Sequence, residues 1–358
     1  MRRRRRLADT RVILVLGLAS VALAWSTLAR GASVWQQVAS GTTTDLNGVW
    51  GSSADDVYVV GDGGVILHTT DRGKTWSLTS VASPSGARTT FNGVWGSGPT
   101  DVYAVGTEGT IVHSSDRGRT WQTQRAESAS APSSPKSTVL KSVWGSGPQD
   151  VYAVGSLDTQ GVALRTKDGG RTWQPLDVKG VLVGVWGSSR HDVWMSLDTA
   201  GAYNSTDDGA TWGLVGGGLT NQWTSLRVFG TSAFNVYLFG WSVVARTTDG
   251  GHSWTSEDSG ATGLWGAGDT VFAVDGTGAI RRKPSGAPFI VHEIRRPMPG
   301  TRENLRLLGD RGWQQERAGA PGTGTWLRGV WGSSAEDVYA VGDAGTILHR
   351  VWSVGTAR

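Results

Sequence analysis

The chain has 358 residues, a net charge of +4 and no cysteine, which excludes disulfide bonds, a cysteine-linked lipid anchor and thiol catalysis. The first 32 residues hold seven Arg and one Asp, so the rest of the chain carries a net charge of −2. This remainder has no cluster of Lys and Arg that would neutralise a run of phosphates, which argues against a nucleic-acid partner.

Residues 1–32 have the pattern of an export signal. A run of five arginines is followed by an uncharged apolar stretch at residues 12–25 and by small residues around Ala29, as in a cleaved signal peptide. Residues 12–29 also reach the lower length limit for crossing a bilayer, so an uncleaved anchor is the alternative. In both cases we expect the rest of the chain to be exported, as a periplasmic, cell-surface or secreted protein, with membrane contact only through this segment.

After this leader, one unit of about forty-five residues is repeated seven times. The second copy contains four short runs with β character, at residues 91–95, 101–105, 110–113 and 120–124, separated by turns rich in Gly, Ser and Asp. A single four-stranded sheet leaves apolar faces exposed, and stacking such sheets around an axis covers them. The sequence therefore predicts an all-β fold, a seven-bladed β-propeller of four-stranded antiparallel blades at residues 33–358.

The two ends of the repeat array offer two ways to close the ring. The last unit supplies three strands. Its missing fourth strand can come from residues 34–38, which resemble the fourth strand of a unit, or from residues 351–354. We favour the N-terminal segment, because only the leader precedes it and it has no other place in the repeat.

Five turns share the pattern Ser/Thr-x-Asp-x-Gly-x-Ser/Thr-Trp between the third and fourth runs of their units. The Asp carboxylate is expected to accept backbone N–H groups of the turn, Gly to adopt a positive φ, and Trp to pack beneath the hairpin. The sixth unit has a shortened form that ends at Trp313. The structural positions of the five full turns are Asp71, Trp76, Asp116, Trp121, Asp168, Trp173, Asp207, Trp212, Asp249 and Trp254.

These turns resemble the Asp-box, or bacterial neuraminidase repeat, a folding motif of enzymes and non-enzymes. Together with the Gly-Thr-Ile-x-His pattern that precedes them, they are similar to the exported propellers related to the photosystem II assembly factor. The resemblance covers roughly residues 34–352 and implies a seven-bladed binding scaffold. It does not imply hydrolysis, because one fold can carry unrelated functions.

Most residues that look like catalytic groups recur in several units, which indicates a structural role. His68, His113 and His349 each end a third strand, and the Asp residues that begin the second strand, such as Asp56, are expected to cap the preceding turn. Aromatic residues of the second strand are expected in the core: Tyr58, Tyr103, Tyr152, Tyr237, Tyr339, Trp194 and Phe272. Unrepeated residues are stronger candidates for function: Glu108, Arg190, Tyr203, Arg227 and Trp241.

The sixth unit is longer than the others because it contains an insertion at residues 285–306. The insertion is rich in charge and includes an apolar Phe-Ile-Val group. Insertions in a repeat array form loops on one face, so we expect a partner-binding surface here, with a tolerated loop as the alternative. Its candidate residues are Phe289, Glu293, Arg295, Arg296, Arg302 and Arg306.

These observations predict an exported, non-catalytic propeller that serves as a protein-binding or assembly scaffold in the cell envelope. Its partner is expected to be an envelope or secreted protein, or a glycan read by exposed aromatic residues such as Trp223, Trp241 and Trp326. The alternative is a glycoside hydrolase of sialidase or endoglucanase type, with carboxylates on one rim: Glu108, Asp158, Asp198 and Asp275. No cofactor or metal is expected, and the protein is expected to be a monomer.

Overall fold

The structure is a computed structural model, and it describes most of the chain after the leader. The described ranges are 33–82, 88–125, 138–199, 201–216, 225–258, 260–268, 270–284, 312–317 and 325–352. The predicted export segment and the insertion of the sixth unit lie outside them, as does Trp223. Within these ranges, no helix has the length and apolar character needed to cross a membrane.

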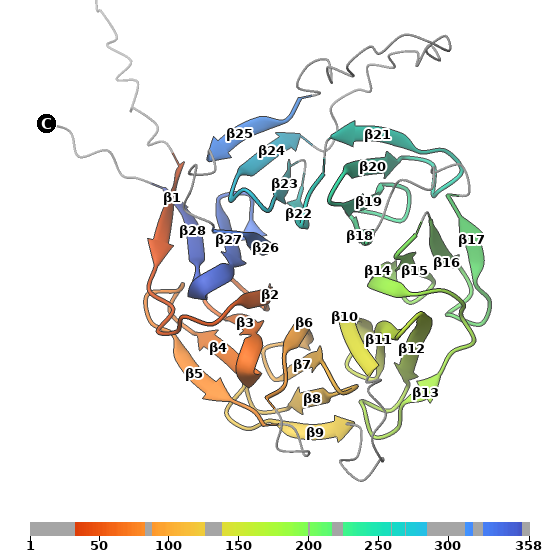
Figure 1. The fold of residues 1–358 in the computed structure, drawn as a ribbon, viewed down its shortest axis with the longest axis horizontal. Coiled ribbons are helices and arrows are strands. Elements are labelled where there is room, and N and C mark those ends of the chain that lie inside the picture. Colours follow the sequence, from red (N-terminus) through yellow and green to blue (C-terminus); the bar gives the residue numbers. More distant parts are fainter. Residues whose placement is uncertain are drawn as a thin grey trace, which may run out of the picture.

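Seven four-stranded sheets stand as blades around a central axis (Figure 1). Blades 1 to 3 are β2 (Leu46–Gly51), β3 (Val57–Gly61), β4 (Val65–Thr69), β5 (Ser77–Ser80); β6 (Phe91–Gly98), β7 (Asp101–Gly106), β8 (Ile111–Ser114), β9 (Gln122–Arg125); and β10 (Thr138–Gly147), β11 (Asp150–Leu157), β12 (Gln160–Thr166), β13 (Gln174–Pro175). Blades 4 to 6 are β14 (Leu182–Ser189), β15 (Asp192–Leu197), β16 (Ala202–Ser205), β17 (Gly213–Val215); β18 (Arg227–Gly230), β19 (Val236–Gly240), β20 (Val243–Thr247), β21 (Thr255–Asp258); and β22 (Gly263–Ala267), β23 (Thr270–Val274), β24 (Ile280–Pro284), β25 (Gln314–Arg317). Blade 7 is β26 (Leu327–Ser334), β27 (Asp337–Gly342), β28 (Ile347–Trp352) and β1 (Ser33–Val38). Two short 3-10 turns, η1 (Asp62–Gly64) and η2 (Asp343–Gly345), follow β3 and β27. The predicted propeller architecture is therefore confirmed.

The N-terminal strand closes the ring. β1 pairs antiparallel with β28, in a register that runs from Ser33 opposite Trp352 to Val38 opposite Ile347. Residues 351 and 352 thus belong to the third strand of blade 7, so the alternative closure by residues 351–354 is wrong. Closure between the two ends of the chain joins the first and last described strands in one sheet.

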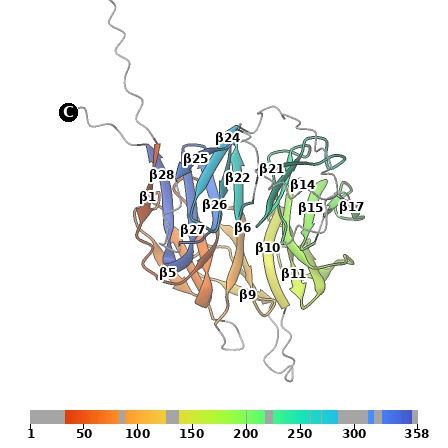
Figure 2. The ribbon, with the colours of Figure 1, turned by 45° about the horizontal axis from the view of Figure 1, so that its top comes forward.

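Strand direction gives the ring two distinct rims (Figure 2). Because β2 begins opposite the end of β3, with Leu46 paired to Gly61, the starts of the innermost strands and the turns between second and third strands share one rim. We call it the mouth rim. The turns between third and fourth strands, which carry the Asp-boxes, lie on the opposite rim, called the Asp-box rim. β1 begins and β28 ends on the Asp-box rim, and the insertion of blade 6 starts and ends there, between β24 and β25.

The aromatic residues of the second strands form the core, as predicted. Their relative exposure is zero in all seven blades, as shown by Tyr58, Tyr103, Tyr152, Trp194, Tyr237, Phe272 and Tyr339. Each blade then packs on the next through apolar residues of facing strands, so the core is a series of clusters between blades.

The half-buried Trp of the innermost strand requires a glycine in the following blade. A Cβ atom added to Gly145 would lie 2.5 Å from the Cη2 of Trp95 and 2.8 Å from the carbonyl oxygen of Asp150. The same contact recurs between Trp50 and Gly96 and between Trp331 and Gly51. The repeated Trp-Gly pair of the sequence is therefore a packing device between neighbouring blades.

Candidate functional site

The Asp-boxes are closed networks of hydrogen bonds on their rim. In blade 1, the hydroxyl of Thr69 donates to Asp71 Oδ1 at 2.7 Å and accepts from the Gly73 N–H at 2.9 Å. Asp71 also accepts the backbone N–H of Thr75 at 2.9 Å and its hydroxyl at 2.6 Å. Gly73 has a φ of 71°, which favours glycine. The pattern repeats at Asp116, Asp168, Asp207 and Asp249.

These hydrogen bonds change the acidity of the five carboxylates. The hydroxyl and backbone N–H of Thr75 lower the pKa of Asp71 from 3.8 to about 2. The equivalent bonds lower the pKa of Asp116, Asp168 and Asp207 to about 2 as well. Because each carboxylate is already occupied by the turn, the Asp-box is suited to hold a hairpin rather than to protonate a substrate.

The Asp-box Trp residues join neighbouring blades. Trp121 of blade 2 meets the ring of Tyr58 in blade 1 edge-on, with centroids 6.3 Å apart. The same contact links Trp76 to Tyr339, Trp173 to Tyr103, Trp212 to Tyr152 and Trp254 to Trp194. The expectation that Trp packs beneath its own hairpin missed this contact with the preceding blade.

The histidines that end the third strands sit in a repeated polar group. His68 Nε2 lies 2.7 Å from Asp56 Oδ1, and the Ser52 hydroxyl donates to the other oxygen of Asp56 at 2.5 Å. The imidazole stacks on Tyr58 with centroids 4.0 Å apart. The serine hydroxyl is directed to the carboxylate rather than to the histidine, so this group lacks the nucleophile-to-base contact of a hydrolytic triad. It recurs at His113 and His349.

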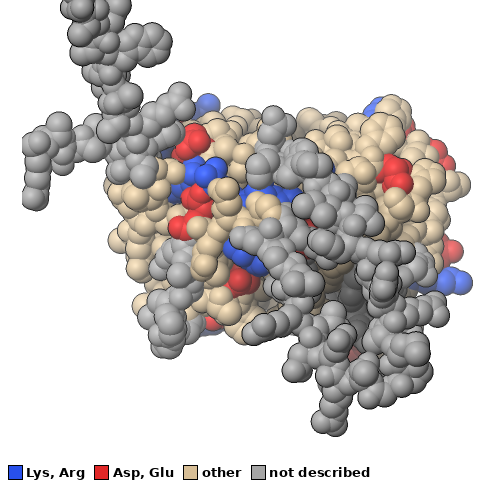
Figure 3. Space-filling model, turned by 90° about the horizontal axis from the view of Figure 1, so that it is seen from above, with Lys and Arg blue, Asp and Glu red and all other residues tan. Residues whose placement is uncertain are grey.

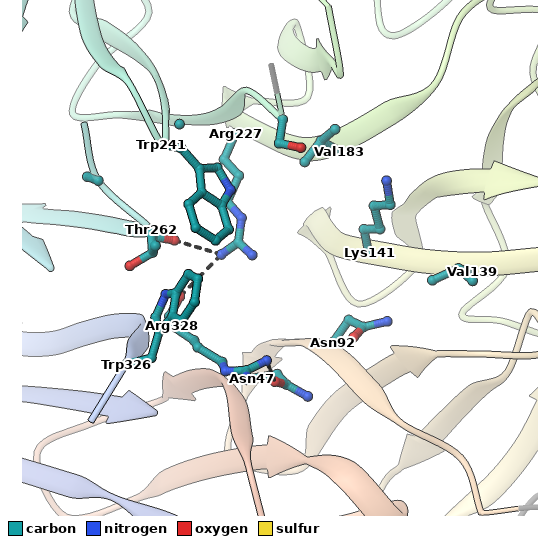
Figure 4. Close-up of a pocket in the computed structure, with 13 residues that line it drawn as sticks. Asn47, Asn92, Val139, Lys141, Val183, Arg227, Trp241, Thr262, Trp326 and Arg328 are labelled. Atoms are coloured by element: carbon teal, nitrogen blue, oxygen red, sulfur yellow. Dashed lines mark hydrogen bonds between the residues drawn. The ribbon is translucent and has the colours of Figure 1, made fainter. Parts of the chain in front are cut away.

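A cavity of about 380 Å³ opens in the centre of the mouth rim (Figure 4). Its wall includes one residue per blade from the region where each innermost strand begins. These residues are Asn47, Asn92, Lys141, Val183, Arg227, Thr262 and Arg328. Trp241 and Trp326 complete the wall on the side of blades 5 to 7. A second space of about 240 Å³ is lined by residues further along the same innermost strands.

The three cations of the cavity wall differ in how they are compensated. Arg328 is held by two carboxylates: Nη2 lies 2.7 Å from Asp45 and Nε lies 2.6 Å from Asp343. Arg227 instead donates Nη1 to two backbone carbonyls, 2.8 Å to Thr262 and 3.2 Å to Arg328. Among the described residues no carboxylate pairs with Arg227. Its charge is therefore available to a ligand.

Burial within the ring and nearby positive charge both lower the pKa of Arg227 and of Lys141. Arg227 reaches the water of the cavity but is surrounded by the ring, and this burial, with the positive charge of Arg328, lowers its pKa from the usual value. Burial also lowers the pKa of Lys141, and the charge of Arg227 adds to that effect, while Asp198 opposes it. An anion between Lys141 and Arg227 would relieve the repulsion.

The aromatic side of the cavity consists of two indoles. Trp241 is 62% exposed, and its ring meets that of Trp326 edge-on, with centroids 4.5 Å apart. Trp241 lies in the two-residue turn between β19 and β20. An exposed indole beside a free guanidinium provides apolar contact and charge within one cavity (Figure 4).

The outer surface of the ring differs from the mouth in its charge. Figure 3 shows Lys and Arg side by side with Asp and Glu on the described part of this face. The partly exposed Arg282, for example, pairs with Glu316 on the neighbouring outermost strand of the same blade. Such pairs compensate one another, so the mouth is the better candidate for binding an anionic group.

The remaining predicted candidates fall in several places. Arg227 and Trp241 meet in the mouth, whereas Arg190 pairs with Asp208 at 2.7 Å near the Asp-box of blade 4. Tyr203 packs beside the core of blades 3 and 4. The insertion candidates Phe289, Glu293, Arg295, Arg296, Arg302 and Arg306 lie outside the described residues.

The carboxylates considered for hydrolysis share the mouth rim but belong to blades 2, 3, 4 and 6. Asp198 accepts the Ser225 hydroxyl at 2.9 Å, and Asp275 accepts the hydroxyl and N–H of Thr277 at 2.6 and 2.8 Å. These two carboxylates therefore hold loops and turns. No group of three or more potential metal ligands occurs in the described part of the chain.

Comparisons with known proteins agree with the sequence resemblance. A family model described as photosynthesis system II assembly factor YCF48 matches residues 28–185. A comparison with curated proteins gives no match. The chain is thus a seven-bladed Asp-box propeller similar to the photosystem II assembly factor, as the sequence predicted.

Solved structures with this fold include proteins with different functions. The structure described as YCF48 bound to D1 peptide is 19% identical, with a TM-score of 0.64, and the match covers 89% of this chain and 97% of that one. YCF48 from Cyanidioschyzon merolae is 17% identical, with a TM-score of 0.63, covering 89% and 99%. A virginiamycin B lyase from Staphylococcus aureus is 11% identical, with a TM-score of 0.62, covering 90% and 100%. At these identities the likeness shows the fold alone.

Proposed function

We propose that this protein is an exported, non-catalytic propeller that binds an acidic segment of a partner protein in the mouth of the ring. Its role would be that of an assembly scaffold in the cell envelope, which holds part of another protein while a complex forms. Export rests on the arginine run and apolar stretch of residues 1–32.

The observation that carries this proposal is the uncompensated charge of Arg227 in the mouth. Arg227 is exposed to the water of the cavity and has no carboxylate partner among the described residues, whereas Arg328 in the same cavity has two. Arg227 has backbone carbonyls only among the described residues, and Lys141 stands across the cavity from it (Figure 4). A carboxylate of a partner would supply the missing charge.

The similarity to the photosystem II assembly factor supports a protein as the partner. One of the similar structures is described as bound to a D1 peptide, which shows that a propeller of this shape binds a peptide. For the present chain, the positive charge of the mouth favours an acidic segment as the partner.

The test uses residues 33–358, the chain without its predicted leader, and peptides immobilised through an N-terminal biotin on a biosensor. One pool contains Asp and Glu among Gly, Ser and Leu, and a matched pool has Asn and Gln in their place. We expect the acidic pool to be retained, more weakly at high salt, and the double variant Arg227→Gln, Lys141→Gln to lose at least about tenfold in affinity. A matched control, Arg119→Gln with Arg171→Gln, removes the same charge from the Asp-box rim and should bind like wild type. Equal binding of both pools would refute the proposal.

A glycan is the second candidate, because the Trp241–Trp326 pair offers an exposed aromatic wall. Neutral cello- and xylo-oligosaccharides on the same sensor would bind independently of Arg227 if this candidate were correct. The hydrolase alternative predicts turnover of sialyl, xyloglucan or cello-oligosaccharide reporters, which we expect to be absent. Turnover that disappears with Asp158→Asn or Glu108→Gln would establish an enzyme instead.

A further inference from the structure

The turns of the mouth rim carry an acidic residue in every blade but one. The first residue after the second strand is Asp in five blades, and Glu108 follows one position later in blade 2. In blade 5 the same place is occupied by Trp241. The ring of acidic turns therefore has a single gap, next to the cavity wall formed by Arg227.

In two blades the acidic turn holds the wall residue of its own blade. The amide of Asn47 donates to Asp62 at 3.0 Å in blade 1, and the guanidinium of Arg328 donates to Asp343 at 2.6 Å in blade 7. Blade 5 has the wall residue, Arg227, but not the acid. Position 241 has no carboxylate, so Arg227 lacks the partner that Asp343 provides to Arg328, which Asp45 also holds.

We infer that Trp241 is the specificity-determining residue of the mouth, and that the site takes a carboxylate adjacent to an apolar side chain. The inference rests on the proposed function and specifies its ligand. Trp241 contributes in two ways: it leaves the charge of Arg227 free for the carboxylate, and its exposed indole, braced by Trp326, contacts the apolar group.

The gap also sets the path of the ligand. An acidic chain that approaches the mouth over the other blades meets carboxylates at the turns, such as Asp62 and Asp198, whereas Asp275 and Asp343 are ion-paired with Arg281 and Arg328. Over blade 5 it meets an indole and a cation, so this approach has the least electrostatic repulsion. The carboxylate that binds can be the end of a chain or an Asp or Glu side chain within it, and both present the same chemistry.

The test uses short peptides on a flexible Gly-Ser linker, immobilised through an N-terminal biotin. The first ends in Leu with a free carboxylate, and the second is its amide. The third is amidated and contains an internal Leu-Asp pair, and the fourth replaces that Asp by Asn. We expect wild type to prefer at least one carboxylate peptide over its neutral match by about tenfold or more. The first and third peptides distinguish a chain end from an acidic side chain.

Substitutions at Trp241 separate its two contributions. Trp241→Asp restores the acidic turn that the other blades possess, and should abolish the preference for the carboxylate. Trp241→Asn matches Trp241→Asp in shape but carries no charge, so it should keep that preference. It should lose the affinity that the Leu side chain gives over a further peptide with Gly in place of Leu. Trp241→Phe should retain both within about threefold. Thermal melts check that each variant is folded.

The outcomes distinguish this inference from the proposed function. If no peptide binds wild type, both fail. If Arg227→Gln with Lys141→Gln removes binding but Trp241→Asp does not, the acidic segment still binds in the mouth and the role given to Trp241 is wrong. Loss of the carboxylate preference in Trp241→Asp but not in Trp241→Asn supports the inference, and equal loss in both overturns it.

Discussion

The Asp-box shows how one short pattern determines both a turn and a contact between blades. Its carboxylate accepts N–H and O–H groups of a single hairpin, and its indole meets the buried aromatic residue of the preceding blade. The turn was predictable because all its donors lie within five positions in sequence. The partner of the indole could not be predicted, because Tyr58 and Trp121 come into contact only when neighbouring blades stack.

A first prediction concerns pH and Asp116. Hydrogen bonds from the Thr120 hydroxyl and backbone N–H lower the pKa of Asp116 to about 2 in the folded protein. Because this pKa is lower than in the unfolded chain, the stabilisation is complete above about pH 4 and is lost as the pH falls toward 2. Asp116→Asn should therefore melt at a lower temperature than wild type at pH 6, and the difference should shrink toward pH 2. A difference that stays constant over this range would contradict the assignment.

A second prediction concerns Trp121. The ring is half-buried and packs edge-on against Tyr58, so Trp121→Ala removes a contact between blades as well as apolar burial. We expect a loss of about 2 to 4 kcal/mol, somewhat below the value for a fully buried Trp. Urea unfolding followed by circular dichroism would measure it, with Trp121→Phe as a milder control. A variant as stable as wild type would show that the ring does not link the blades.

At the scale of elements, the strand runs of the second unit were predicted within a few residues. Residues 91–95 and 110–113 correspond to β6 (Phe91–Gly98) and β8 (Ile111–Ser114). The alternation of β-branched residues with Gly-rich turns determines these strands locally. The pairing of β1 with β28 joins segments far apart in sequence, and only the shortage of one strand in the last unit indicated it.

An element that sequence reasoning missed is the ionic link between blades 5 and 6. Glu257 on β21 binds Lys283 on β24, and Arg246 on β20 lies 3.5 Å from the same carboxylate. All three are at most 7% exposed. Three charged residues on three different strands carry no common pattern in the sequence, so their meeting depends on the fold.

A third prediction follows from this link. Glu257→Gln removes the buried carboxylate that Lys283 and Arg246 share, so it should destabilise the protein by about 3 to 5 kcal/mol. Chemical unfolding of residues 33–358 would measure the change, with Glu336→Gln as a control at a half-exposed carboxylate. A loss below about 1 kcal/mol would contradict a stabilising role for this link between the blades.

At the scale of the whole molecule, the two rims carry different features. The Asp-box rim carries the folding turns, both ends of the described chain and the two strands that flank the insertion. The mouth rim carries the cavity with Arg227 and Trp241. Both residues were candidates in the sequence because neither recurs in the other units. Their proximity could not be predicted, because it depends on how the blades are arranged around the axis. The pairing of Arg328 with Asp343, which Arg227 lacks, also appears only in the folded ring.

The final prediction separates the two rims. The insertion at residues 285–306 is bounded by β24 and β25, which remain paired through Arg282 and Gln314 at the Asp-box rim. Replacing residues 286–304 by a short Gly-Ser linker should therefore leave the melting temperature nearly unchanged. Because the mouth lies on the opposite rim, this deletion should also leave binding of the acidic peptides unchanged.

If the insertion forms its own partner surface, as its charge and apolar group predict, the deletion should abolish recovery of partners from an envelope extract. The double variant Arg227→Gln, Lys141→Gln should then reduce the recovery of a different set of proteins, or should reduce only the binding of the acidic peptides. Mass spectrometry of proteins bound to immobilised residues 33–358 and to the two variants gives this comparison. Recovery of every partner by the deletion variant would contradict a binding role for the insertion and leave the mouth as the site of recognition.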